Sequence, residues 1–213
     1  MRKWLGKSRG TTPLKQSKLI EKEKNVIKVI YEAKGLWNVE VRQTADLVFN
    51  ELQIPNAGQN LEPGEPSLPQ EGLYVAIPDD ATVTEIRVGK TKKKTYKLDY
   101  KVKPAPEPTT DPSGMPEINP KKEIYESDNA YPGVLFKNLG VKQLGDVKVI
   151  HLMMYPVQYY PLSNKIDLYR KIELEIEYEL GVEKAPPLRG VPERSKRRIP
   201  AGYDDQILNI ENI

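Results

Sequence analysis

Between Leu168 and Leu180 the sequence alternates apolar and charged residues more regularly than anywhere else. Successive side chains of a β-strand point to opposite faces of a sheet, so this alternation predicts a strand with one buried and one solvated face. The buried face would carry Ile172, Leu174, Ile176, Tyr178 and Leu180, and the solvated face Lys171, Glu173, Glu175, Glu177 and Glu179. A charged outer face discourages edge-to-edge pairing with other chains. Such one-sided burial is typical of antiparallel sheets.

The segment from Val147 to Tyr155 differs, because both of its faces are apolar. One face would carry Val149, His151, Met153 and Tyr155, and the other Ile150, Leu152 and Met154. A strand that is apolar on both faces must be covered on both. The core of a sandwich covers only one face of each strand. We therefore expect an arm of this chain, or a partner, to cover the other face.

Short strand patterns bounded by turn residues recur at residues 25–33, 73–77 and 95–102. Trp37 to Val41 is expected to form a return strand after a turn at Gly35. Residues 44–52 fit either a strand or a short helix. The lysine-rich residues 89–94 are typical of a solvated hairpin tip, because clusters of like charge lie in water.

Nineteen prolines in 213 residues favour turns and extended segments over long helices. Pro63, Pro66 and Pro69 predict a rigid, extended entry into the strand at 73–77. Residues 103–120 contain six prolines, which exclude a helix or a central strand and predict a long irregular loop. Together these patterns predict an all-β fold, an antiparallel β-sandwich with jelly-roll or Greek-key connections.

The composition also divides the chain. Residues 1–24 are basic and aperiodic, and we expect a mobile arm. The β-sandwich would span residues 25–181. Residues 182–203 have the proline-rich, basic composition of a linker. Residues 204–213 would form a short helix or the start of a following domain.

Several classes of function are disfavoured by composition. A net charge of +3, from 33 basic and 30 acidic residues, is too balanced for a nucleic-acid partner. No apolar run approaches the roughly 18 residues of a membrane helix, and the N-terminus lacks the apolar stretch of a signal peptide. Without cysteine the chain has no disulfide, thiolate metal site or cysteine nucleophile.

Catalysis by this chain is not expected either. A Ser-His-Asp triad would have to use His151, the single histidine, which lies in an apolar strand and fits a core or interface position better. The aspartates at 79–80 and 204–205 lack the spacing of a calcium loop, and no phosphate-binding or dinucleotide-binding glycine pattern occurs. We therefore expect no enzyme activity and no cofactor.

Two blocks of sequence carry a family resemblance. The first is the stretch GEPSLPQEGLYVAIPDDATVTEIRV at residues 64–88. The second combines Tyr131-Pro-Gly, residues 145–155, Pro156 to Tyr160 and the outgoing strand to Leu180. In order and spacing they resemble the propeptide domain of the gingipain-type cysteine peptidases, family C25. The resemblance implies a secreted protein whose partner, in cis or in trans, is a caspase-like cysteine peptidase domain. The catalytic Cys and His of that family have no counterparts here.

Gingipain-type peptidases cleave after arginine or lysine, and their propeptides hold them inactive until cleaved. The resemblance therefore implies that this chain binds such a peptidase and keeps it latent, and we add that it assists folding. A basic side chain on the proline-rich loop would fill the specificity pocket, and Lys103, Lys121 and Lys122 are the candidates. Lys196, Arg197 and Arg198 lie where the junction with the catalytic domain would be cleaved, although a solvated tether has the same composition.

The alternative is a free-standing β-sandwich module for adhesion or carbohydrate binding. Such a module needs exposed aromatic side chains on one face. Tyr155, Tyr159 and Tyr160 are the candidates in this sequence.

Overall fold

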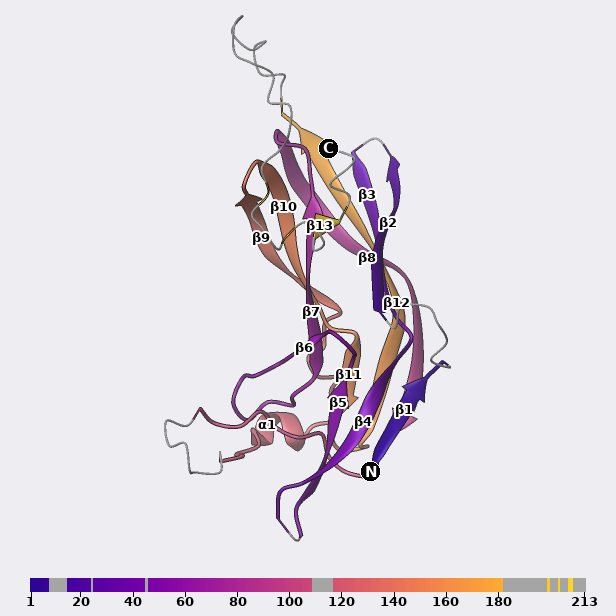
Figure 1. The fold of residues 1–213 in the computed structure, drawn as a ribbon, viewed down its shortest axis with the longest axis vertical. Coiled ribbons are helices and arrows are strands. Elements are labelled where there is room, and N and C mark those ends of the chain that lie inside the picture. The colour runs from indigo at the N-terminus through magenta and orange to yellow at the C-terminus, as the bar shows by residue number, and fades with distance from the viewer. Residues whose placement is uncertain are drawn as a thin grey trace, which may run out of the picture.

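The computed structural model describes residues 1–7, 15–23, 25–44, 46–108, 117–181, 199, 203 and 207–208. These residues form an elongated all-β sandwich of largely antiparallel sheets (Figure 1). The fold class expected from the alternating sequence patterns is confirmed.

The first sheet has the strand order β13-β7-β10-β9, and β6 pairs with the edge of β7. Its strands are β6 (Gly58–Gln59), β7 (Pro69–Ala76), β9 (Phe136–Leu144), β10 (Val147–Met154) and β13 (Ile207–Leu208). The short β13 runs parallel to β7, with Ile207 opposite Tyr74. Residues 204–213 were expected to begin a helix or a new domain, so the extended strand at 207–208 is a different outcome. Residues 204–206 and 209–213 of that segment lie outside the described residues.

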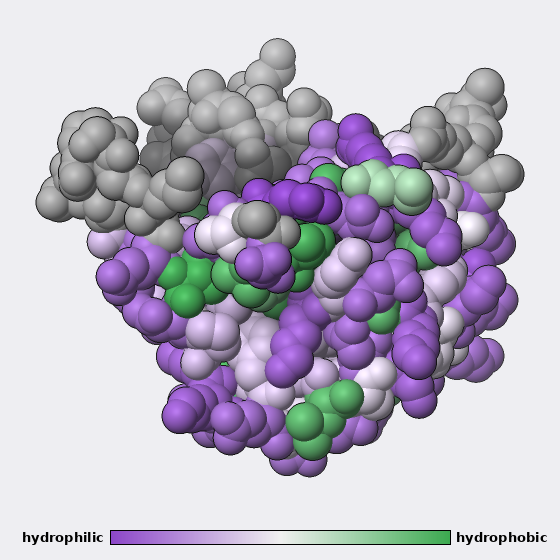
Figure 2. Space-filling model, turned by 90° about the horizontal axis from the view of Figure 1, so that it is seen from below, coloured by the Kyte–Doolittle hydropathy of each residue, from purple (hydrophilic) through white to green (hydrophobic). Residues whose placement is uncertain are grey.

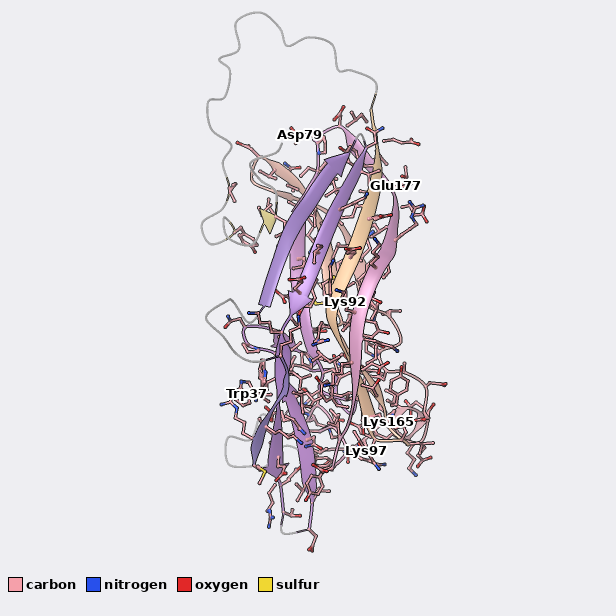
Figure 3. All side chains as sticks on the ribbon, turned by 90° about the vertical axis from the view of Figure 1, so that its right-hand side faces the viewer. Trp37, Asp79, Lys92, Lys97, Lys165 and Glu177 are labelled. Carbon is pink, nitrogen blue, oxygen red and sulfur yellow. The ribbon has the colours of Figure 1, made fainter. Side chains whose placement is uncertain are left out.

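The second sheet is built around one long strand, β12 (Lys165–Leu180), which the strict alternation predicts. Its order is β11-β12-β3-β2, and β8 pairs with β12 along nearly its whole length. The remaining strands are β2 (Lys15–Glu23), β3 (Val26–Ala33), β8 (Ala81–Lys97) and β11 (Val157–Tyr160). Figure 3 shows Lys97 beside Lys165 at one end of this pair and Glu177 toward the other.

The third, smaller sheet has the order β1-β4-β5, with strands β1 (Arg2–Gly6), β4 (Gly35–Arg42) and β5 (Val48–Gln53). Residues 2–6 and 15–23 belong to the segment expected to be an arm, yet both form strands, because each finds a partner edge in β4 or β3. The only helix within the described residues is the single turn α1 (Lys122–Tyr125).

Two local expectations were wrong. β3 and β4 are separated only by Lys34 but do not pair as a hairpin; the chain crosses from the second sheet into the third. The lysine-rich residues 89–94 are not a hairpin tip either, because they lie in the middle of β8. Their charges are tolerated there because β8 is exposed and faces acidic side chains of β12, as in the 2.6 Å ion pair of Lys93 with Asp167. Residues 44–52, which fitted a strand or a helix, contain β5.

One large hydrophobic core joins the three sheets, and a second, smaller cluster lies on the outer face of β7 and β10. Ile150, Leu152 and Met154 of β10 enter the main core. Val147 and Val149 point the other way and pack with Ile207 and Ala76. The second face is therefore covered at Val149 by residues from the C-terminal part of this chain, whereas His151, Met153 and Tyr155 of the same predicted face are half-buried.

Candidate interaction site

The proline-rich segment is held by backbone hydrogen bonds at its base, at the lower end of the molecule in Figure 1. We call this structure the loop base: residues 60–67, 102–107 and 117–121. Proline has no backbone N–H, so only the residues between prolines can donate. Three such donors are used: Lys103 N donates to Asn50 O at 2.9 Å, Ala105 N to Glu65 O at 2.8 Å, and Glu107 N to Glu117 O at 3.0 Å.

The same base binds the returning chain. Lys121 N donates to Gly64 O at 2.9 Å, and Gly64 N donates to Ala105 O at 2.9 Å. Gly64 has φ +76°, and a Cβ there would lie 2.5 Å from Asn119 O, so only glycine allows this close approach. The two ends of the segment are thereby fixed next to each other on a rigid support.

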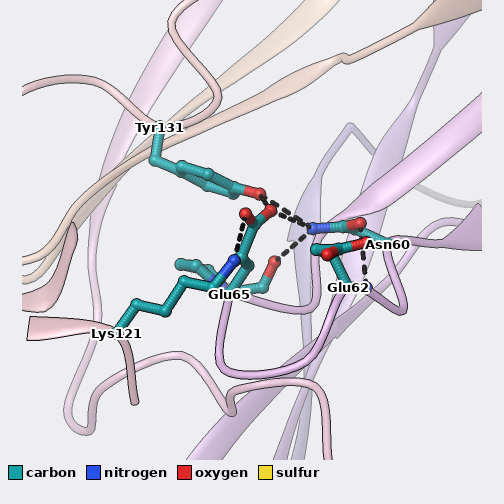
Figure 4. A network of polar contacts seen from close by, with 6 residues as sticks. Asn60, Glu62, Glu65, Lys121 and Tyr131 are labelled. Atoms are coloured by element: carbon teal, nitrogen blue, oxygen red, sulfur yellow. Dashed lines mark hydrogen bonds and ion pairs between the residues drawn. The ribbon is translucent and has the colours of Figure 1, made fainter. Parts of the chain in front are cut away.

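A polar network centred on Glu65 links the loop base to the body (Figure 4). Its carboxylate accepts hydrogen bonds from Lys121 Nζ at 2.8 Å, from Asn60 Nδ2 at 3.3 Å and from the Tyr131 hydroxyl. Burial disfavours the charged carboxylate, but these three donors outweigh burial and lower the pKa of Glu65. Burial, followed by the hydrogen bond to Glu65, raises the pKa of Tyr131, so this hydroxyl stays protonated and remains a donor.

Two tyrosines support the base from inside. The Tyr125 hydroxyl of α1 donates to Val102 O at 2.9 Å, and Val102 N donates to the Tyr159 hydroxyl of β11 at 3.2 Å. Burial raises the pKa of Tyr125 well above its ordinary value and that of Tyr159 to about 12. Both phenols are neutral near pH 7, as their hydrogen bonds require. α1 is thus fastened to the segment that it follows.

The three predicted partner-binding lysines have different surroundings: Lys103 and Lys121 belong to the loop base, and Lys122 directly follows it. Lys121 pairs with Glu65, and Lys103 is half-buried. Lys122 is exposed at the first position of α1, and neither it nor Lys103 forms an ion pair with a described residue. The predicted processing residues Lys196, Arg197 and Arg198 lie outside the described residues.

Exposed apolar side chains accompany this site, and no sequence pattern singled them out. Leu61, in the turn of the loop base, is 72% exposed, and Leu162, between β11 and β12, is 62% exposed. Asp128, just after α1, accepts a 2.9 Å hydrogen bond from Ser163 N, which joins this turn to the α1 region. Viewed from below, Figure 2 shows separate hydrophobic patches in a largely hydrophilic end surface. Exposed apolar patches rimmed by polar residues are typical of protein-binding surfaces.

Among the described residues, neither a catalytic triad around His151 nor an aromatic carbohydrate-binding face is formed. His151 stacks on Tyr74 with ring centroids 4.5 Å apart, and its buried Nδ1 has no hydrogen-bond partner among the described residues. Burial, and then the nearby Lys142, lower the pKa of His151. Tyr159 is fully buried, and Tyr160 donates to Asp167 at 3.2 Å, so the three candidate tyrosines form no exposed aromatic platform.

Within the described part of the chain, no group of His, Cys, Asp and Glu side chains has the arrangement of a metal site. None of the described helices has the length and apolar character needed to cross a bilayer.

Comparison with known proteins gives a consistent result. The family model Propeptide_C25 matches residues 8–208. A solved chain from work on the zymogenic latency of gingipain K from Porphyromonas gingivalis superposes with a TM-score of 0.66 at 19% identity, over 85% of this chain and 100% of that one. A second, from the complex of the Porphyromonas gingivalis RgpB pro- and mature domains, gives a TM-score of 0.66 at 21% identity, over 80% and 86%. At such identities the two structures show the shared fold. The comparison with curated proteins returned no match.

Proposed function

Because this chain belongs to the propeptide family of the C25 peptidases, we propose that it binds the catalytic domain of a gingipain-type cysteine peptidase and keeps it latent. It acts outside the cell, in cis within a precursor or in trans, and it assists folding of the catalytic domain. The match over residues 8–208 carries this proposal. The two structural relatives support it, since one comes from work on latency and the other is a complex of pro- and mature domains.

The loop base is the part of the surface that we propose contacts the peptidase. An inhibitory segment must enter a cleft without being rearranged, and the hydrogen-bonded base and Glu65 network limit such rearrangement. Lys122 is the best candidate for the specificity pocket because it is exposed and forms no ion pair with the described part of the chain. Lys121 would position the proline-rich segment through its ion pair with Glu65. Lys103 would add a contact with the peptidase at the periphery of the interface.

Inhibition by the purified chain tests this assignment. We expect Lys122→Ala to weaken inhibition of a gingipain-type peptidase by about tenfold or more, because a charged group in a specificity pocket contributes more than 1.4 kcal/mol. Lys97→Ala, at an exposed lysine of β8, serves as the matched control and should inhibit like the unchanged chain. If Lys103→Ala, Lys121→Ala and Lys122→Ala all inhibit at full strength while remaining folded by circular dichroism, the loop base is not the contact.

We propose a second role for the linker of residues 182–203, in which cleavage near Lys196, Arg197 and Arg198 separates the propeptide from the peptidase. Exposed, extended backbone is what proteases require. In a precursor fused to the peptidase, replacing all three residues by alanine should abolish cleavage or move it elsewhere. N-terminal sequencing of the product measures the position. Unchanged cleavage at this point would remove the role while leaving the inhibitory proposal standing.

A further inference from the structure

The described residues that follow the basic cluster lie against the body of the molecule. β13 runs beside β7, and Figure 1 shows it against the sheet of β7, β10 and β9. Ile207 is 5% exposed and packs with Ala76, Val147 and Val149 in the outer cluster. The rings of Tyr203 and Tyr74 meet edge to face with centroids 5.8 Å apart, and Ile199 packs on the same cluster.

The body has a matching surface for these residues. Tyr74 and Ala76 of β7 point outward, away from the main core, and their register partners on β10 are His151 and Val149. His151 stacks on Tyr74 and so supports the ring against which Tyr203 packs. Without the C-terminal residues, this apolar face would be open to water. The two-sided apolar character of β10 is therefore explained by a specific cover from the same chain.

We propose that Ile199, Tyr203, Ile207 and Leu208 form an anchor that stays bound to the outer face of β7 and β10 after the chain is cut in the linker before them. The proposal rests on the proposed function in one respect, that the linker is a processing site. Hydrolysis after Arg198 adds one water across one peptide bond and leaves a carboxylate on Arg198 and an amino group on Ile199. Tyr203 and Ile207, the main contacts, are untouched by this reaction.

The strength of the contact is bounded by the geometry. In the intact chain residues 182–198 connect these residues to β12, and a random-coil connection of that length would give an effective concentration of about 1 mM. A segment that is docked under those conditions has a Kd below about 1 mM for the same surface when free. After cleavage this contact and the peptidase contact act together, so cutting the linker alone does not release a domain that begins at Ile199.

The test uses the full chain with a recognition sequence for a site-specific protease placed in residues 182–198. After cleavage, equilibrium dialysis through a membrane that passes only the fragment 199–213 measures how much fragment the body retains. We expect retention with a Kd below about 1 mM. Tyr203→Ala and Ile207→Asp should each weaken retention by about tenfold or more, since each removes a buried apolar contact. Leu162→Ala, on an exposed turn, should leave it unchanged.

Two outcomes would overturn the anchor: complete escape of the fragment at millimolar body, or equal retention of the Ile207→Asp fragment. Because Tyr203 and Ile207 lie on the released fragment, the effect of changing them on retention does not depend on folding of the body. The experiment contains no peptidase, so its failure is separate from a failure of the inhibitory function.

Discussion

The Glu65 carboxylate accepts hydrogen bonds from Asn60, Lys121 and Tyr131. The most distant of these donors in sequence, Tyr131, is 66 residues away from Glu65. Sequence reasoning selected Lys121 as a basic residue for a partner's pocket, but its ammonium is held by this carboxylate. Nothing in the local pattern around Lys121 or Glu65 indicates the pairing, because it depends on how the loop base closes. The prediction that Lys121 belongs to the contact therefore stays a prediction, in a positioning role.

The Glu65 network should make stability depend on pH. Its folded-state pKa is lowered, so its contribution is present above the unfolded pKa of about 4.3 and is lost as pH falls through the folded value. At pH 7 we expect Glu65→Gln to lower the free energy of unfolding by about 1–3 kcal/mol, because the buried donors lose a charged acceptor.

Urea denaturation at pH 7 and at pH 3 measures this effect. The loss caused by Glu65→Gln should be smaller at pH 3, because this pH lies below the unfolded pKa of about 4.3 and part of the stabilisation by the charged carboxylate is lost there. Glu62→Gln, in the same turn and exposed, is the control and should change stability by less than about 0.5 kcal/mol. A loss of the same size at both pH values would contradict an electrostatic role for Glu65.

At the scale of elements, the sequence predicts a strand wherever one regular pattern of apolar residues runs along its whole length. β12 and β10 follow directly from period-two patterns of apolar residues. Pairing partners were not readable. Gly35 suggested a return strand, but β4 pairs with β1 and β5. The prediction failed because a hairpin and a crossing between sheets produce the same local alternation of residues. The lysines between residues 90 and 94 suggested a tip because the acids near them, such as Asp167 beside Lys93, lie on β12, some 70 or more residues later.

The two faces of β10 should be energetically separate. Val149 and Ile207 share the outer cluster, whereas Ile150 lies in the main core. In a double-mutant cycle, Val149→Ala and Ile207→Ala should show a coupling of about 0.5–2 kcal/mol, because neighbours in one cluster are not additive. Ile150→Ala is the matched control; its effect should add to that of Ile207→Ala within about 0.5 kcal/mol. Denaturation of the unchanged chain, the three single variants and the two double variants gives the values. Additivity of the first pair would mean that Ile207 does not cover β10.

For the whole molecule, composition and patterning were sufficient for the all-β sandwich class, and the matched sequence blocks for the propeptide family. The three-sheet arrangement and the strand order were not predictable, since they rest on contacts between distant segments. The chain's candidate site is likewise only partly local. The prolines predict a stiff excursion, but the donors that fix its base lie on residues 50, 64 and 67 as well as on the excursion itself.

The architecture suits a protein that acts by shape. Its three sheets share one hydrophobic core, and its loop base is hydrogen-bonded at both ends. A rigid surface loses little conformational entropy on binding, which favours tight occlusion of a cleft. The central claim is therefore that this chain covers the active site of a gingipain-type peptidase.

Accessibility of the peptidase's catalytic cysteine tests that claim most directly. A covalent active-site probe is added to a gingipain-type peptidase with increasing amounts of this chain, and the labelled fraction is measured by mass spectrometry. Our account predicts that labelling falls in proportion to the added chain and is suppressed at one equivalent when both proteins are micromolar. Full labelling with the chain demonstrably bound would contradict the account, because binding would then leave the active site open.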